Sequence, residues 1–303
     1  MWASDTNSAW ILVPFVRSVV CTIATHVNAA VRLHRLAVCL LHNSLLPTQL
    51  AQLFTTEERA NLTEQAKQLR RMKGLGKSVL VIGASRGIGL QFVRTLVEQK
   101  YTVWGTVRPQ SNRVPAAEML HSLGAKVLVL DFLDEQSIIA ASKAIEVSGK
   151  LDVLINCGGA DTAPRSWEEE TQDTILTKFK IMGPFLATKH FAPLLSPGSP
   201  GKIINISSDP ASIKDTDGGR MSYRMAKASL NMQTASRAAD FKASNTNIAI
   251  VAVHPGRVPT DLSGGKGDVD LVESVQGMVK IMEGMDMESS GRFLYYNGEE
   301  MSW

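Results

Sequence analysis

From residue 77 onward, short apolar segments that suit β-strands alternate with longer segments that have helical spacing. The strand-like segments span residues 78–82, 102–107, 126–130, 151–155, 202–206 and 248–253, and the helical ones span 90–99, 135–146, 178–195 and 223–242. Near-continuous apolar strands separated by helices are typical of a parallel sheet buried on both faces. We therefore predict an α/β fold, a Rossmann-like doubly wound parallel sheet of about seven strands, in a single domain over residues 77–303.

Residues 1–76 precede this pattern and differ from it in composition. Asp5 is the only acidic residue among the first 52, and Arg17 interrupts an apolar stretch that would otherwise approach the roughly 20 residues of a membrane span. The residues Thr55-Thr56-Glu57-Glu58 resemble a capping box, which predicts a helix to near residue 73. We interpret residues 1–76 as an N-terminal extension and leave three alternatives open. These are a disordered or loosely helical segment, a transit or signal segment and a membrane anchor.

The composition bears on the partners that the chain can have. The formal net charge is +3, from 32 basic and 29 acidic residues, so we expect no nucleic-acid partner. Cys21, Cys39 and Cys157 are widely separated, and no cluster of cysteine or histidine has metal-ligand spacing, so we expect no bound metal. Free thiols in odd number fit a reducing compartment, and the predicted location is the cytoplasm, or an organelle if the extension is a transit peptide. For Cys157 the simpler interpretation is a small buried hydrophobic residue.

A glycine-rich motif follows the first predicted strand and opens the first predicted helix. It has the spacing G-x-x-x-G-x-G and comprises Gly83, Ala84, Ser85, Arg86, Gly87, Ile88 and Gly89. Glycines allow a tight turn that lets backbone N–H groups approach a phosphate, and a helix N-terminus favours the negative charge. The alternative is an ordinary glycine-rich turn, which the strand–turn–helix context disfavours. We predict a phosphate-binding turn.

Two polar segments follow later strands. Tyr223 and Lys227 open a predicted helix, and a separation of four residues places both side chains on one face. A nearby ammonium group favours phenolate and so lowers the pKa of tyrosine toward neutrality, as a general acid for a carbonyl oxygen requires. Ser207 and Ser208 come at the end of another strand, where open parallel sheets bind ligands. Alone, each segment could equally be an exposed helix pair or a polar loop.

In this order and at these separations, the glycine motif, Ser208 and the Tyr223–Lys227 pair resemble the short-chain dehydrogenase/reductase family. The resemblance covers residues 77–303. Asn156-Cys157-Gly158-Gly159 is similar to the family's N-N-A-G segment. Asp131 matches the aspartate that meets the adenine, and Pro255-Gly256 with Thr260 resembles the motif that holds the nicotinamide amide. Residues 223–232, 254–256 and 291–303 are similar to the C-factor or sniffer-like carbonyl reductases.

The resemblance implies a role for each matched residue. Tyr223 would donate or accept the proton, Lys227 would lower its pKa and bond the nicotinamide ribose, and Ser208 would orient the carbonyl, while Ser207 would be structural. The cofactor-binding residues implied are Gly83, Ser85, Arg86, Gly87, Ile88, Gly89, Arg108, Asp131, Asn156, Gly158, Tyr223, Lys227, Pro255, Gly256, Val258 and Thr260.

One position departs from the family pattern. In the segment Lys180-Ile181-Met182-Gly183, Lys180 stands where the family usually has an asparagine that holds a water of the proton relay. A lysine offers donors but no acceptor, so this substitution puts the relay in doubt.

Charge near the second predicted strand bears on the choice of cofactor. A protein that binds NAD places an acidic residue at the end of this strand, where this chain has Val107 followed by Arg108. Arg86 lies within the glycine turn. Two guanidinium groups suit the 2′-phosphate of NADP, so we predict NADP rather than NAD.

Together these features predict an NADP(H)-dependent oxidoreductase that reduces a carbonyl compound, or oxidises the alcohol, with tyrosine, lysine and serine. The alternative is a dinucleotide-binding regulatory or signalling protein with little turnover. The expected partners are a small carbonyl or alcohol substrate and a second copy of the chain, in a homodimer or homotetramer. A membrane contact would be made only through the extension.

Overall fold

The computed structural model describes residues 73–109, 113–159, 166–173, 175, 182–195 and 200–303. The N-terminal extension up to residue 72 lies outside these ranges, and so do the helix predicted after Thr55, Cys21, Cys39 and Lys180. The proposed boundary at residue 77 and the altered proton relay therefore stay predictions.

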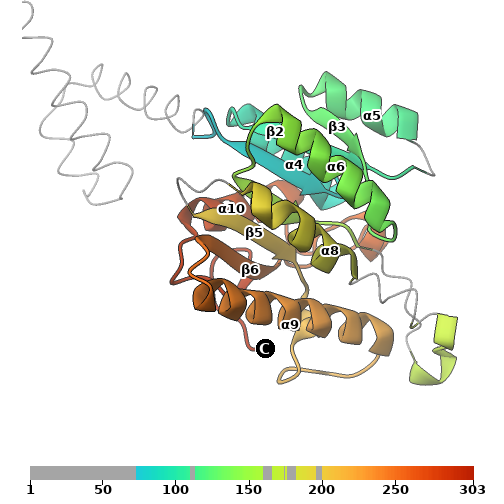
Figure 1. Cartoon of the computed structure of the whole chain (residues 1–303). Helices are drawn as coiled ribbons and strands as arrows, with labels where there is room; N and C mark the ends of the chain where they lie inside the picture. Colours follow the sequence, from blue (N-terminus) through green and yellow to red (C-terminus); the bar gives the residue numbers. More distant parts are fainter. Residues whose placement is uncertain (1–72, 110–112, 160–165, 174, 176–181, 196–199) are drawn as a thin grey trace, which may run out of the picture. The chain divides into compact units, whose positions relative to one another are not determined.

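The described part of the chain is built on a parallel sheet of seven strands in the order β3-β2-β1-β4-β5-β6-β7 (Figure 1). The strands are β1 Ser78–Ile82, β2 Thr102–Val107, β3 Lys126–Val129, β4 Val153–Asn156, β5 Gly201–Ile206, β6 Ile248–His254 and β7 Phe293–Tyr295. All six neighbouring pairs are parallel. This order reverses between β1 and β4, as in a doubly wound sheet, and confirms the predicted Rossmann-like fold.

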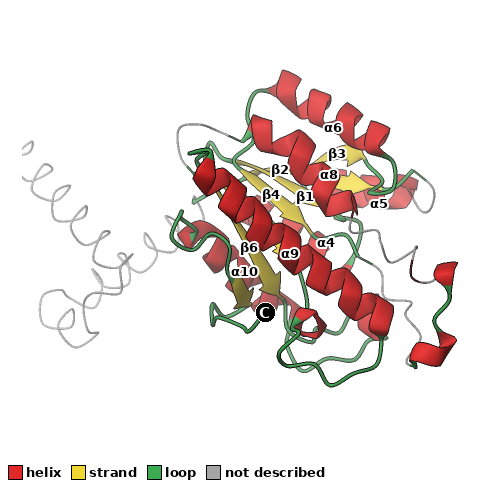
Figure 2. Cartoon of the chain, turned by 60° about the horizontal axis from the view of Figure 1, so that its bottom comes forward, coloured by secondary structure: helices red, strands yellow, loops and turns green. Residues whose placement is uncertain are grey.

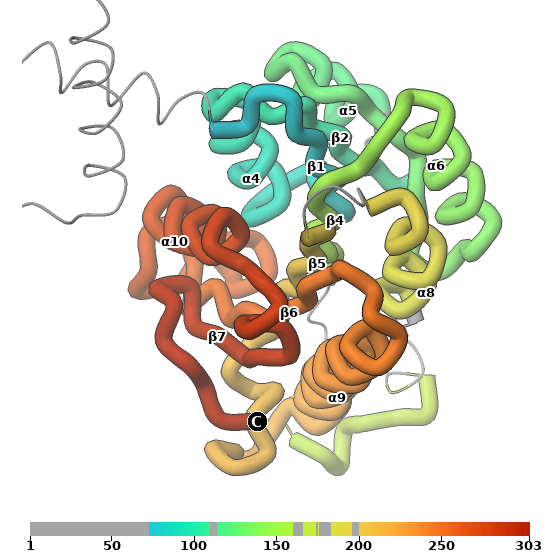
Figure 3. Tube along the Cα trace, turned by 60° about the vertical axis from the view of Figure 1, so that its left-hand side comes forward, coloured from blue at the N-terminus to red at the C-terminus, as the bar shows by residue number. Residues whose placement is uncertain are grey.

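Helices cover both faces of the sheet. They are α4 Gly87–Glu98, α5 Arg113–Ser122, α6 Glu135–Ser148, α8 Met182–Phe191, α9 Met221–Ala243 and α10 Leu271–Gly284. Figure 3 shows α4 and α10 on one side of the strands and α6, α8 and α9 on the other. Figure 2 shows the long helix α9 running beside β6, against which it packs. None of the helices in the described ranges is long and apolar enough to cross a membrane.

The alternation of side chains along β1 explains why both faces need a helical cover. Val79 and Val81 belong to one core cluster, and Leu80 and Ile82 belong to the other. The first cluster is completed from α4, α5 and α10 by Phe92, Leu96, Leu120, Met278 and Met282. The second is completed from α6 and α8 by Ile138, Ile145, Ala187 and Phe191. Because successive side chains of a strand point to opposite faces, an unbroken apolar strand is the pattern of a doubly covered sheet.

Several element boundaries differ from the prediction. β4 begins at Val153 rather than at Leu151, which instead forms an isolated parallel bridge with Leu195. The predicted helix over 178–195 is α8 only from Met182 to Phe191 in the described residues, and it is followed by the 3-10 turn η3 Ala192–Leu194.

Two α-helices and one strand had no separate prediction. β7 is only three residues long, too short for a periodic pattern. α5 has little apolar periodicity. α10 had clear signals, because Asp270 caps its first turn and apolar residues recur along one face.

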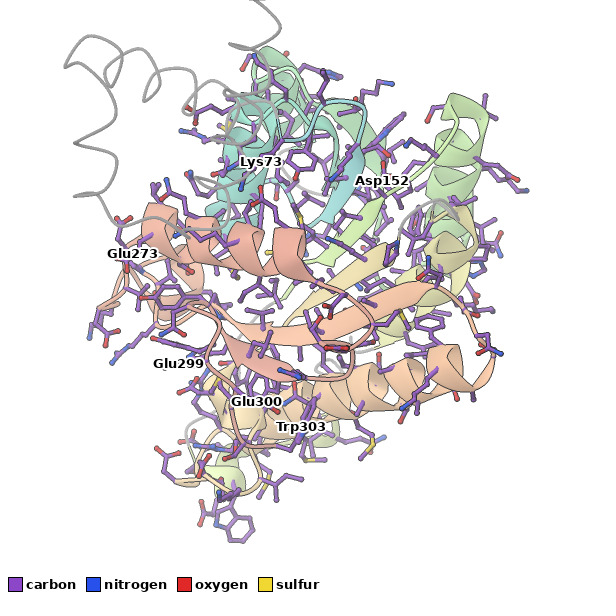
Figure 4. All side chains as sticks on the ribbon, turned by 90° about the vertical axis from the view of Figure 1, so that its left-hand side faces the viewer. Lys73, Asp152, Glu273, Glu299, Glu300 and Trp303 are labelled. Atoms are coloured by element: carbon purple, nitrogen blue, oxygen red, sulfur yellow. The ribbon has the colours of Figure 1, made fainter. Side chains whose placement is uncertain are left out.

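The C-terminal segment folds back beside β7. Leu294 and Glu300 form an antiparallel bridge, and the ring of Trp303 stacks on Phe293 with centroids 5.7 Å apart. Figure 4 shows Glu300 and Trp303 close to β7. The chain end therefore covers the edge of the last strand, which would otherwise present unpaired backbone groups.

Candidate active site

The glycine motif forms a tight turn between β1 and α4. Gly83 has a left-handed φ of +89°, and its N–H donates to Oγ1 of Thr106 at 3.0 Å. A Cβ added to Gly89 would lie 2.1 Å from the carbonyl oxygen of Gly83, so only glycine lets the start of the helix approach the turn this closely. A Cβ added to Gly87 would lie 3.5 Å from Cγ2 of Thr260. The turn, the start of α4 and the loop after β6 therefore meet at one place.

Tyr223 and Lys227 lie together at the end of β5. The Lys227 ammonium donates to the carbonyl oxygen of Ile206 at 2.8 Å, and its Nζ lies 5.9 Å from the centroid of the Tyr223 ring. The Tyr223 side chain is largely buried. Ser208 follows β5, so the structure brings the three predicted catalytic residues to the carboxyl edge of the sheet.

The two serines after β5 have different surroundings. The Ser207 hydroxyl is buried and donates to Oδ1 of Asn231 in α9 at 2.6 Å. The Ser208 hydroxyl donates to Oδ1 of Asp209 at 3.0 Å. Ser207 therefore links the end of β5 to α9. Ser208 is only partly buried, and its partner Asp209 is exposed.

A buried chain of polar side chains crosses the sheet beneath these residues. Asn156 Nδ2 donates to Asn205 Oδ1 at 2.8 Å, and Asn205 Nδ2 donates to Thr234 Oγ1 at 2.9 Å. These bonds fix the Asn156 amide, whose Oδ1 is buried and has no hydrogen-bond partner among the described residues. The sequence prediction included Asn156 but missed Asn205 and Thr234, although a polar residue inside an apolar strand was a signal.

The loop after β6 carries the next group of predicted residues. The Ser274 hydroxyl of α10 donates to the carbonyl oxygen of Pro255 at 2.6 Å. Gly256 has a φ of +77°, and a Cβ there would meet Val269 at 2.8 Å. Val258 is buried, and Thr260 caps the short 3-10 helix η5 Asp261–Ser263. Packing on both sides therefore fixes the loop that touches the glycine turn.

Arg86 and Arg108, the residues predicted to select the cofactor, are both exposed. Arg108 directly follows β2, and Asp131 follows β3 and accepts a hydrogen bond from the N–H of Leu133 at 3.0 Å. Arg86 lies in the glycine turn, where its Nη1 is 3.0 Å from Oδ2 of Asp261. This ion pair joins residues far apart in the chain, so local sequence patterns do not predict it.

Two titratable side chains beside the site are held neutral by burial. Burial is the largest effect on His254 and lowers its pKa, while Asp209, whose Oδ1 is 3.6 Å from His254 Nε2, opposes this. Burial raises the pKa of the Cys157 thiol to about 12, against the opposing charge of Lys227. At neutral pH the site therefore contains an imidazole and a thiol rather than two more charges. In the described ranges no group of three histidine, cysteine, aspartate or glutamate residues could hold a metal ion.

Comparison with known proteins identifies the family of this chain. The family model for short chain dehydrogenases matches residues 77–269, which is more than half of the chain. The chain belongs to the short-chain dehydrogenase/reductase family. It is therefore an oxidoreductase.

The relatives also confirm the resemblance to one subgroup. C-signal of Myxococcus xanthus is 33% identical over 159 residues, which cover 52% of this chain and 95% of the relative. A carbonyl reductase from chicken fatty liver, solved with NADPH bound, is 33% identical with a TM-score of 0.69, covering 76% of this chain and all of that one. Carbonyl reductase Sniffer of D. melanogaster is 25% identical with a TM-score of 0.68 and the same coverage.

Proposed function

We propose that this chain is an NADPH-dependent carbonyl reductase, in which Tyr223, Lys227 and Ser208 carry the proton chemistry. The observation that supports it most is the position of Lys227. Its ammonium donates to the carbonyl oxygen of Ile206, which precedes Ser208 by two residues in the chain. The same ammonium lies beside the Tyr223 ring. A phenol next to a fixed cation, at the ligand-binding edge of a parallel sheet, suits protonation of a carbonyl oxygen.

The residues around the glycine turn fit a dinucleotide. A pyrophosphate needs close backbone approach and a helix N-terminus, which the Gly83 turn and the start of α4 supply. The buried acceptor of Asn156 at the neighbouring strand end is suited to a ligand donor. Arg86 and Arg108 on the rim suit a 2′-phosphate, and the chicken relative was solved with NADPH. When bound, the nicotinamide would supply the hydride.

The side chains of this chain would handle the proton and the orientation of the substrate. The Tyr223 hydroxyl would donate its proton to the carbonyl oxygen, and the Lys227 ammonium would stabilise the phenolate that remains. The Ser208 hydroxyl would turn from Asp209 to donate a hydrogen bond to the same oxygen as negative charge develops there.

The Tyr223→Phe variant tests this proposal, because it removes the hydroxyl and keeps the ring. Oxidation of bound NADPH would be followed in single turnovers with a panel of aldehydes and ketones. We expect the rate to fall by roughly 10²–10⁴-fold while the NADPH dissociation constant changes less than about twofold. A variant rate within tenfold of the parent would refute the role of Tyr223. NADPH binding without turnover on any carbonyl would favour the alternative, a dinucleotide-binding regulatory protein.

A further inference from the structure

A second cation lies on the ring of Tyr223. The guanidinium carbon of Arg220 is 4.3 Å from the ring centroid, whereas Lys227 Nζ is 5.9 Å from it. Both distances are within the range of a cation–π contact, and guanidinium groups commonly stack on aromatic rings. Arg220 is the N-cap residue of α9, so the start of this helix positions both the phenol and the additional charge.

The backbone before α9 adopts a conformation that brings this contact about. Gly218, Gly219 and Arg220 have successive left-handed φ values of 81°, 66° and 51°. Glycine accepts this region readily, but a long L-residue such as arginine rarely does. The Arg224 guanidinium donates to the carbonyl oxygens of Gly218 and Gly219, at 2.9 Å and 2.8 Å from Nε, and so fixes this stretch. A restrained and unusual backbone thus places Arg220 against the tyrosine.

We propose that Arg220 is a positioning residue for proton transfer, a second cation that acts with Lys227 to stabilise the phenolate form of Tyr223. The catalytic meaning of this effect rests on the proposed function, but the effect on the phenol itself does not. A cation close to a phenol favours its charged form, so Arg220 lowers the pKa of Tyr223 and its removal raises it. A unit charge a few ångströms from the phenolic oxygen shifts its pKa by about one unit or more.

Other titratable groups near Tyr223 come from four neighbouring segments. His254 of β6 and Cys157 after β4 are neutral at neutral pH, because burial lowers the pKa of the imidazole and raises that of the thiol to about 12. Asp209, in the 3-10 helix η4 Asp209–Ala211, has a side chain that is 65% exposed, so solvent screens its charge. Glu170 follows the 3-10 helix η1 Trp167–Glu169, and its carboxylate accepts a hydrogen bond from the N–H of Ser222 at 3.0 Å. Its negative charge therefore lies against the positive end of the α9 helix dipole. Arg220 and Lys227 differ from these groups in that both contact the Tyr223 ring itself.

The tyrosine content of the chain allows a direct test that needs no substrate. There are four tyrosines, and the pKa of each of the other three is raised. Burial raises the pKa of Tyr101 to about 12, and it also raises those of Tyr295 and Tyr296. Because two cations contact its ring, we expect Tyr223 to be the first phenol to ionise when the full-length protein is titrated and phenolate is followed by ultraviolet absorbance. The Tyr223→Phe variant assigns this transition, because it should lack it.

Two substitutions remove the charge and still suit the backbone. Asparagine and glycine both accept a left-handed φ, so Arg220→Asn and Arg220→Gly keep the start of α9. We expect the first ionisation to move upward by about one pH unit in both, and to stay within about 0.3 unit in Arg220→Lys, which keeps the cation. The matched control is Arg237→Met, because Arg237 lies on the same helix with its guanidinium 5.0 Å from the Phe185 ring. This control should leave the titration unchanged.

The outcomes separate this proposal from the proposed function. An unchanged first ionisation in both Arg220→Asn and Arg220→Gly would overturn it, and so would an equal shift in Arg237→Met. If the parent reduces a carbonyl compound, the alkaline limit of its reduction profile should rise by the same unit in Arg220→Asn, because the protonated phenol then persists to higher pH. Absence of turnover with every carbonyl would refute the reductase function and leave the titration result standing.

Discussion

Replacing Gly89 by alanine tests whether the close approach of α4 to the glycine turn holds the cofactor site together. The added Cβ would lie 2.1 Å from the carbonyl oxygen of Gly83 and 2.8 Å from its carbonyl carbon. These neighbours are backbone atoms, so no side-chain rotation can relieve the overlap. The first turn of α4 must move away from the loop, which separates the groups that would surround a pyrophosphate.

The expected loss of stability can be derived from the cost of overpacking at a rigid contact. Inserting a methyl group into such a site costs about 1–3 kcal/mol of the free energy of unfolding. For a domain of this size each kcal/mol lowers the melting temperature by roughly 2–4 °C, so we expect a fall of about 2–12 °C by circular dichroism. We also expect the NADPH dissociation constant, from quenching of protein fluorescence, to rise at least about tenfold, or about 1.4 kcal/mol.

Gly284→Ala is the matched control for this change. Gly284 ends α10, and no heavy atom lies within 4 Å of a Cβ added there. Alanine has the higher helix propensity, so this variant should keep or slightly raise the melting temperature and leave NADPH affinity unchanged. A Gly89→Ala protein that melts within about 1 °C of the parent and binds NADPH within about twofold would show that the contact is not required.

Three further measurements probe the rim and the core of the site. NADPH should bind more tightly than NADH, and Arg108→Asp should narrow or reverse that difference; equal dissociation constants in the parent would contradict it. Asp261→Asn should tighten NADPH but not NADH, because the Asp261 carboxylate and a 2′-phosphate compete for Arg86. With the other two cysteines replaced by serine, Cys157 should react with iodoacetamide far more slowly at pH 8 than free cysteine, and its rate should keep rising above pH 9, because burial raises its pKa to about 12. A rate that levels off near pH 9 would be inconsistent with that pKa.

The sequence predicted those parts of the fold that depend on local patterns. The long apolar strands could be found because burial on both faces leaves no polar alternation, as in β6, where all seven residues are buried. The contact between Tyr223 and Lys227 follows from their separation of four residues on a helix. β7 could not be located in this way, because three residues carry no period and its pairing depends on β6.

Contacts between distant segments were beyond the reach of local patterns. Asp209 meets His254 because the ends of β5 and β6 are neighbours in the sheet. The left-handed backbone of Arg220 follows two glycines, which show only that a turn is present and not where the guanidinium lies. In both cases the residue types were visible in the sequence, but the tertiary arrangement gave them their partners.

Two acidic residues at the site occupy groups that a bound ligand would need. Asp209 accepts the Ser208 hydroxyl, and Asp261 pairs with Arg86. Under the proposed function, a carbonyl oxygen would have to replace one carboxylate, and a 2′-phosphate would have to replace the other. The Arg86–Asp261 pair is largely exposed and hence weak, and a phosphate carries more negative charge than a carboxylate, so the exchange favours the phosphate. A carbonyl oxygen is neutral until hydride arrives, so a carbonyl substrate would gain the Ser208 hydroxyl from Asp209 only as its negative charge develops. The bond from Ser208 would then stabilise the transition state rather than the bound ground state.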